Sequence, residues 1–255
     1  MKIDSTQRFG NRAENYAKYR PDYPAQIVTF MTSELDLNKN SVVADIGSGT
    51  GICSELFLKN GNVVYAVEPN DKMRETAEHL LSKYPRFISQ KGTAESTGLP
   101  DGIADFIVAA QAFHWFDVDA ARFEFERILK TGGQVVLIWN DRRASGTPFS
   151  EAYERLLTKF GTDYQQVRHR NLDENRIQEV LGEFECQHFL NHQDLNFESL
   201  VGRLASTSYV PNSGQPRFDE MLAELSRIFD AYNKNHQVRI EYDTRLYSSK
   251  ARRKI

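Results

Sequence analysis

The chain has 255 residues, 40% hydrophobic and 26% charged, a composition typical of globular proteins and unlike that of disordered or collagen-like chains. Its formal net charge of −3 gives no electrostatic reason to expect a phosphate backbone as partner, so a nucleic-acid-binding function is disfavoured. The two cysteines, Cys53 and Cys186, lie far apart without CxxC spacing, which predicts neither a disulfide framework nor a metal site.

Neither export nor membrane anchoring is expected from the sequence. The first residues contain no apolar segment, and no stretch approaches the roughly 18 apolar residues that span a bilayer. We therefore expect a soluble, cytoplasmic protein without a membrane partner, and the sequence leaves its oligomeric state open. The basic run at 250–254 is interpreted as a solvated tail with no assigned partner.

The first half of the chain alternates apolar strands with amphipathic helices. Strands are expected at 41–46, 62–67, from 87, at 104–110 and at 134–139, and helices at 52–59, 73–81 and 118–129. Asn70 and Asp117 are potential N-caps of the second and third helices, and Gly132 with Gly133 is expected to end the third. Five strands that alternate with helices predict a parallel sheet with helices on both faces.

Beyond residue 140 the pattern is less regular. Helices are expected near 148–160, 172–182, 197–206 and 216–234, and strands near 184–190 and from 238 to 246. An antiparallel pair that closes the sheet is the simplest arrangement, with helices inserted between its two strands. These helices are candidates for a substrate-side cover.

A glycine-rich segment at 42–51, with the sequence VVADIGSGTG, runs from an apolar strand directly into a helix. Glycines in such a loop allow positive φ and a close approach of the backbone to a ligand. The dinucleotide pattern GxGxxG would require glycine at the position of Ile52, whereas the third glycine is Gly51. The spacing therefore disfavours a nucleotide-binding oxidoreductase, which the α/β layout alone would allow.

A carboxylate, Glu68, stands at the end of the second predicted strand. In this position a carboxylate can accept hydrogen bonds from both ribose hydroxyls of an adenosine ligand. The alternative is that Glu68 is only an exposed residue at a strand end.

Residues 40–140 resemble the class I S-adenosylmethionine-dependent methyltransferases, whose motifs are an acidic residue before GxGxG and an acidic end of the second strand. The segments 92–100 and 105–115 are similar to the family's loop after the third strand and to its fourth strand. The resemblance implies a Rossmann-like methyltransferase fold, S-adenosylmethionine as cofactor and methyl transfer as the reaction. It also implies one domain over 1–255, with an N-terminal helical flap at 1–40, a cofactor-binding core at 41–140, and sheet completion with substrate-side helices at 141–255.

The resemblance assigns the glycine loop to the methionine part of the cofactor, Glu68 to the ribose and the loop at 93–95 to the adenine. The segment 9–24 looks like the flap of small-molecule members similar to trans-aconitate methyltransferases, in which an aromatic residue and an arginine approach the methionine end. The implied cofactor-binding residues are Asp45, Gly47, Ser48, Gly49, Gly51, Glu68, Thr93, Ala94, Glu95, Gln111, Tyr16, Tyr19 and Arg20. Tyr16 and Tyr19 could instead only pack a helix. The family often has Asp where this chain has Thr93, so Glu95 or a backbone carbonyl is the alternative contact to the adenine amine.

Methyl transfer from a sulfonium is an in-line displacement, so orientation of the acceptor supplies much of the catalysis. His114, after the fourth strand, is the candidate base for a protonated acceptor, because imidazole titrates near neutral pH. A structural imidazole in a loop is the alternative. Trp115, Arg142 and Arg143 are candidate substrate-binding residues, with packing and solvation as the alternatives.

The acceptor class follows mainly from an absent signature. Methyltransferases of nucleic acid bases carry Asp/Asn-Pro-Pro-aromatic after the fourth strand, where this chain has Gln-Ala-Phe-His at 111–114. We therefore expect O- or C-methylation of a small molecule, with a carboxylate metabolite as one option. A nucleotide-binding oxidoreductase and a non-catalytic S-adenosylmethionine-binding protein remain alternatives.

Overall fold

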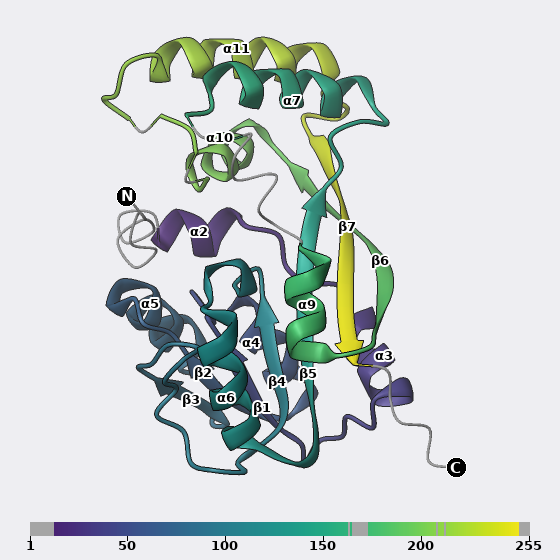
Figure 1. Cartoon of the computed structure of the whole chain (residues 1–255). Helices are drawn as coiled ribbons and strands as arrows, with labels where there is room; N and C mark the ends of the chain where they lie inside the picture. The colour runs from purple at the N-terminus through teal and green to yellow at the C-terminus, as the bar shows by residue number, and fades with distance from the viewer. Residues whose placement is uncertain (1–12, 163, 165–172, 208, 212, 250–255) are drawn as a thin grey trace.

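The computed structural model describes residues 13–162, 164, 173–207, 209–211 and 213–249. They form a seven-stranded sheet in the order β3-β2-β1-β4-β5-β7-β6 (Figure 1). The strands are β1 (Val42–Ile46), β2 (Val63–Val67), β3 (Phe87–Gln90), β4 (Ala104–Ala110), β5 (Leu129–Arg142), β6 (Phe184–Leu195) and β7 (Val238–Ser249). The neighbours from β3 to β5 are parallel, whereas β7 runs antiparallel to both β5 and β6. The predicted fold class is confirmed.

Helices cover both faces of the sheet. These are α3 (Gln26–Glu34), α4 (Ile52–Asn60), α5 (Asp71–Leu81), α6 (Val118–Ile128) and α9 (Glu174–Leu181). Successive residues of a strand point to opposite faces. Accordingly Ile107 packs in the apolar cluster with α6 and α9, and Val108 packs in the cluster with α3 and α4. A strand buried on both sides reads as a continuous apolar run, as 106–110 does.

A third apolar core lies beyond the ends of β5 and β7. It joins α7 (Pro148–Phe160), α10 (Phe197–Ala205) and α11 (Phe218–Tyr232) to the first residues of β7. Figure 1 shows these helices stacked at the upper end of the molecule, the end toward which β4 and β5 point. Between this layer and the sheet lies α2 (Ala13–Tyr19), which contacts both α10 and α5.

Two predicted helix caps are confirmed and one predicted helix end is wrong. The side-chain oxygens of Asn70 and Asp117 accept hydrogen bonds from backbone amides in the first turns of α5 and α6. The third helix does not continue to Gly132, because Leu129 is already extended and pairs with Ala104 in the sheet. Gly132, with φ +83°, lies instead where the register between β4 and β5 shifts. Strands β5, β6 and β7 also extend further than predicted, and β5 includes Arg142, beyond the predicted strand end at residue 139.

Parts of the predicted terminal segments lie outside the described residues. Of the N-terminal flap, the structure describes residues from Ala13 onward, and the basic run at 250–254 is not described. In the described part of the chain no helix is long and apolar enough to cross a membrane.

Candidate active site

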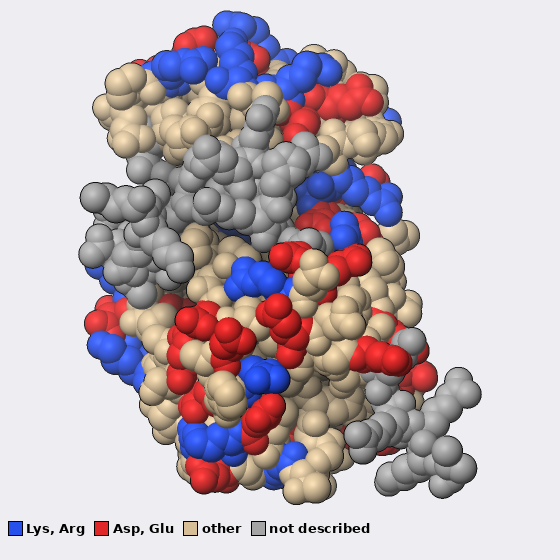
Figure 2. All heavy atoms as spheres, in the orientation of Figure 1, with Lys and Arg blue, Asp and Glu red and all other residues tan. Residues whose placement is uncertain are grey.

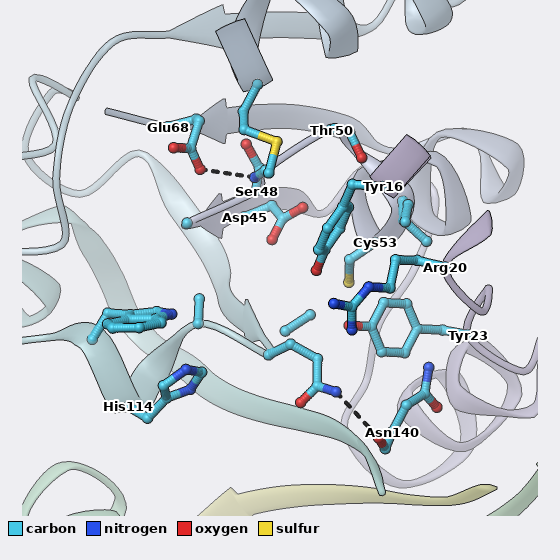
Figure 3. A pocket seen from close by; sticks show the side chains of 18 of the residues that line it. Tyr16, Arg20, Tyr23, Asp45, Ser48, Thr50, Cys53, Glu68, His114 and Asn140 are labelled. Atoms are coloured by element: carbon cyan, nitrogen blue, oxygen red, sulfur yellow. Dashed lines mark hydrogen bonds between the residues drawn. The ribbon is translucent and has the colours of Figure 1, made fainter. Parts of the chain in front are cut away.

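A cavity of about 670 Å³ lies at the carboxyl ends of the parallel strands. Loops gather at this edge because each strand of a parallel sheet ends there, which is where ligands bind in such folds. Its wall includes the predicted residues Tyr16, Arg20, Asp45, Gly47, Ser48, Gly49, Glu68, Thr93, Ala94, Glu95, Gln111, His114, Trp115 and Arg142. Side chains of several of these point into one space, as Figure 3 shows.

Three predicted site residues lie outside the lining of this cavity. The Tyr19 ring packs against α10 at Gly202, and its hydroxyl donates to Glu198 at 3.5 Å. Tyr19 therefore packs α2 against α10, which is the packing alternative given for this residue. Gly51 begins α4 and faces Leu81 of α5. Arg143 is exposed and lies 4.0 Å from Glu241.

The glycines of the loop after β1 have different physical roles. Gly47 has φ +71°, and a Cβ on it would come within 2.6 Å of Ala112 Cβ, so this residue allows two loops to pack closely. Gly49 has φ +57°, and a Cβ on it would meet no atom within 4 Å. The space over Gly49 is therefore part of the cavity and open to a ligand.

The Glu68 carboxylate is fixed beside this loop. It is 8% exposed, which excludes the alternative of an exposed strand-end residue. Its Oε2 accepts from the Gly49 amide at 2.9 Å (Figure 3), and its Oε1 accepts from the Asn70 amide at 2.8 Å. Each carboxylate oxygen can accept a further hydrogen bond, so Glu68 is held in place and can still bind donors. Burial raises the pKa of Glu68, and the two amide hydrogen bonds oppose that rise.

Asp45, the last acidic residue before the glycine loop, is fully buried. Its Oδ2 accepts from Ser54 Oγ at 2.6 Å, while its Oδ1 is buried without a hydrogen-bond partner among the residues described. Burial raises the pKa of Asp45 to about 7, and the charge of Glu68 adds to the rise. A buried acceptor without a donor is costly, so this end of the cavity is suited to a cationic or hydrogen-bond-donating ligand group.

The raised pKa of Asp45 predicts a pH-dependent stability without added cofactor. Between about pH 4 and 7 the folded protein holds a proton that the unfolded chain has lost, so the free energy of unfolding falls as the pH rises, by about 4 kcal/mol. The raised pKa of Glu68 acts in the same direction. Urea unfolding at pH 5 and pH 8 measures the part of this change above pH 5, about 3 kcal/mol.

Asp45→Asn should flatten this dependence and make the protein more stable than the wild type at pH 8. The exposed Asp230 of α11 supplies the control, because Asp230→Asn should leave the wild-type dependence in place. Equal pH dependence in wild type and Asp45→Asn would contradict a buried, proton-binding Asp45.

A short turn after β4 presents the candidate base. The 3-10 helix η2 (Phe113–Trp115) buries Phe113 and leaves His114 and Trp115 at the cavity, with ring centroids 4.6 Å apart. Before it, Gln111 adopts φ +55°, an unusual value for a residue other than glycine. Its Nε2 donates to the Asn140 carbonyl at 3.1 Å, which ties the end of β4 to the end of β5 (Figure 3).

Arg142 is not the solvated arginine that one alternative described. Its side chain is 12% exposed and forms an ion pair with Glu154 of α7. The same Nη2 donates to the Tyr164 hydroxyl at 2.7 Å, while Nη1 is buried without a partner among the described residues.

Sequence reasoning missed a group of residues that line the cavity. They are Tyr23, Cys53, Asn140, Tyr164, Arg203, Tyr209, Tyr242 and Arg245. Most come from the second half of the chain, where no motif marks them. Tyr23 belongs to the segment 9–24 that resembles the flap of small-molecule methyltransferases, and that resemblance is the signal that could have found it.

Comparisons with known proteins agree with this geometry. Residues 44–137 match the family described as methyltransferase domain. An uncharacterised methyltransferase-like protein of Schizosaccharomyces pombe is 25% identical over 94% of each chain. A second uncharacterised methyltransferase of that organism is 33% identical over 57% of each chain, and one of Mycobacterium tuberculosis is 32% identical over 54% of each. In these two comparisons the similarity thus spans about half of the relative.

Solved structures show the same fold. A protein of Anaeromyxobacter dehalogenans assigned as a type II methyltransferase has a TM-score of 0.67 at 21% identity, covering 91% of this chain and 98% of its own. A methyltransferase assigned to an antibiotic biosynthesis pathway of Anabaena variabilis has a TM-score of 0.62 at 25% identity, covering 91% and 99%. The relatives favour methyl transfer over the oxidoreductase alternative. The family match, the relatives and the fold together identify the chain as a class I S-adenosylmethionine-dependent methyltransferase.

Proposed function

We propose that this methyltransferase acts on a small molecule that enters the cavity beside the cofactor, and that the methyl group goes to oxygen or carbon. The observation that carries the proposal is the cavity itself, whose volume of about 670 Å³ lies within the range of small-ligand sites, about 300–1,000 Å³. α2 and the helical layer of α7, α10 and α11 stand over the strand ends. A macromolecular acceptor would have to displace these helices.

The residues at one end of the cavity fit S-adenosylmethionine. The buried Asp45 Oδ1 lacks a donor, and the space over Gly49 is open, so both the charge and the shape of this end suit the cofactor's methionine part. Glu68 can accept hydrogen bonds from the ribose hydroxyls, and Thr93, Ala94 and Glu95 would border the adenine. Tyr16 and Arg20 of the flap, whose side chains stack at 4.7 Å, would approach the methionine end.

Catalysis by the chain's own residues then consists of orientation and proton removal. When bound, S-adenosylmethionine would supply a sulfonium methyl group for in-line transfer to the acceptor, with S-adenosylhomocysteine as the leaving group. The walls fix the acceptor against that group and keep water out. His114 would accept the proton of a hydroxyl or carbon acid, and Trp115 would pack against the acceptor.

The function is tested by a turnover screen. The protein is incubated with S-adenosylmethionine and a library of metabolites, and the release of S-adenosylhomocysteine is measured for each compound. Release that depends on one compound supports an enzyme with a small-molecule acceptor. Tight cofactor binding in calorimetry with no release for any compound would favour the non-catalytic binding protein, and binding of NAD in place of S-adenosylmethionine would favour the oxidoreductase.

Glu68→Ala should bind S-adenosylmethionine at least about tenfold more weakly than the wild type, because a hydrogen bond to a charged group contributes about 1.5–3 kcal/mol. Glu68→Gln should show a smaller loss, since the amide oxygen can still accept. Calorimetry measures both. The control is Glu78→Ala on the exposed face of α5. Wild-type affinity in a folded Glu68→Ala protein would remove Glu68 from the site.

A further inference from the structure

The cavity contains a buried arginine that the assignments above do not use. Arg203 of α10 is 6% exposed and lines the same cavity as Glu68 and His114. Its Nε donates to the Tyr242 hydroxyl at 3.2 Å, and Tyr242 in turn donates to Gln193 Oε1 at 2.7 Å. Within the described residues no carboxylate lies within 4.0 Å of this guanidinium. It is therefore held in position by neutral groups that do not balance its charge.

A second guanidinium lies close to the first. Arg20 of the flap donates through Nη2 to the Ser206 carbonyl, at 3.0 Å, just after the end of α10, and its Nε is buried without a partner in the part of the chain described. Burial, and after it the charge of Arg203, lowers the pKa of Arg20. Figure 3 shows the Arg20 side chain pointing into the cavity between Tyr16 and Tyr23.

A third guanidinium, that of Arg142, shares a neighbour with Arg203. Burial raises the pKa of Tyr153 to about 12, and the charges of Arg203 and Arg142 both oppose that rise, so both arginines lie near the same ring. The distance from Arg142 Cζ to the centroid of the Tyr153 ring is 5.3 Å. Arg142 is balanced by Glu154 but keeps an unused Nη1 donor.

The cavity is therefore acidic at one end and basic at the other. Asp45 and Glu68 lie at the glycine-loop end. At the helical end Arg142 is paired with Glu154, and Arg245 with Asp141 at 2.7 Å, whereas Arg203 has no such carboxylate among the described residues. Burying a charge without a counterion is costly, and a buried charge is normally paired. A ligand anion would supply the missing charge, and a guanidinium can hold a carboxylate with two parallel hydrogen bonds.

We propose that Arg203 binds a carboxylate of the methyl acceptor, with Arg142 Nη1 as a second donor, so that this enzyme selects acceptors carrying a carboxylate at a fixed distance from the atom to be methylated. This assignment rests on the proposed function of the cavity. Arg20, which lies over the Tyr16 ring on the flap, stays with the proposed methionine end of the cofactor.

The test measures binding first, so that it does not depend on knowing the natural acceptor. Wild type, Arg203→Gln and Arg203→Lys are saturated with S-adenosylhomocysteine and titrated in a calorimeter with a set of aliphatic and aromatic mono- and dicarboxylates. The neutral amides of these compounds and inorganic phosphate are titrated in parallel. Arg227→Gln, on the exposed face of α11, is the matched control.

We expect carboxylates to bind the wild type and the control at least about tenfold more tightly than their amides. Arg203→Gln should lose that preference, Arg203→Lys should keep part of it, and all variants should bind S-adenosylhomocysteine within about twofold of the wild type. Equal binding of acids and amides to the wild type would overturn the proposal, as would a carboxylate preference that survives in Arg203→Gln. Preferential binding of phosphate would overturn the assignment to a carboxylate.

Three further outcomes separate the possible sources of the anion and distinguish this inference from the proposed function. A large loss of S-adenosylhomocysteine affinity in Arg203→Gln would mean that Arg203 holds the cofactor's carboxylate, which overturns the inference. Turnover of neutral acceptors at a kcat/KM that Arg203→Gln does not change would refute the inference and leave the proposed function intact. Arg203-dependent binding of carboxylates with no turnover of any compound would support the inference and count against catalysis.

Discussion

Gly49→Val will bind S-adenosylmethionine at least about 100-fold more weakly than the wild type, a loss of about 2.7 kcal/mol. Gly49 lines the cavity, and a Cβ on it would meet no protein atom within 4 Å. The valine side chain would therefore occupy cavity space that the cofactor needs. The Gly49 amide also positions Glu68, so a shift of the loop would disturb the second contact to the cofactor. Calorimetry with S-adenosylmethionine measures the loss.

The matched control for this variant is Gly61→Val. Gly61 also has positive φ, +94°, and a Cβ on it would likewise meet no atom within 4 Å, but it ends α4 and does not line the cavity. Both variants carry the cost of a β-branched residue at positive φ, which thermal unfolding measures. Ordinary cofactor affinity in a folded Gly49→Val protein, or an equal loss in Gly61→Val, would show that the loop is not the cofactor's contact.

His114→Ala should lower kcat about 10²–10⁴-fold with the acceptor that the turnover screen identifies, while cofactor affinity stays within a few-fold of the wild type. The reason is that η2 places this imidazole at the cavity, directly after β4 and next to Trp115. Removal of a base slows the proton transfer but removes no hydrogen bond assigned to the cofactor. Steady-state kinetics and calorimetry on the same preparations measure the two quantities.

A histidine on the surface of α5, His79, supplies the control, and His79→Ala should keep the wild-type rate. If His114→Ala retains wild-type kcat, the residue is a structural imidazole in the loop. If the variant loses cofactor affinity and rate by the same factor, His114 supports the binding site and not the proton transfer.

The sequence could predict the cofactor end of the site because its residues are neighbours in the chain. A strand, the glycine loop, a helix, a second strand and Glu68 follow one another within about 30 residues. Each of these elements has its own local signal in the sequence. Short apolar runs mark the strands, and glycine marks the turns that need positive φ. Asn70 is of a residue type that favours the N-cap position, and it marks the start of α5. These signals do not depend on the rest of the fold.

The acceptor end could not be predicted in the same way. Arg203 and Tyr242 lie on α10 and β7 and reach the cavity only because β7 returns to pair with β5. Helical periodicity places Arg203 on some face of α10 but does not say what that face meets. The sequence therefore directed attention to Arg142 and Arg143, which lie at the end of β5 and directly after it, and only Arg142 lines the cavity.

The late return of β7 also determines what the growing chain exposes during synthesis. β5 pairs with β7 through contacts such as Leu137 with Tyr247, which lie about 110 residues apart in the chain. At a synthesis rate of about 5–20 residues per second, one edge of β5, whose central residues are apolar, stays unpaired for about 5–20 seconds until β7 is made. Unpaired edges of this kind favour association between chains. The first half of the sequence holds the recognisable motifs, but one edge of β5 in the sheet that supports them is covered only when β7 has been made.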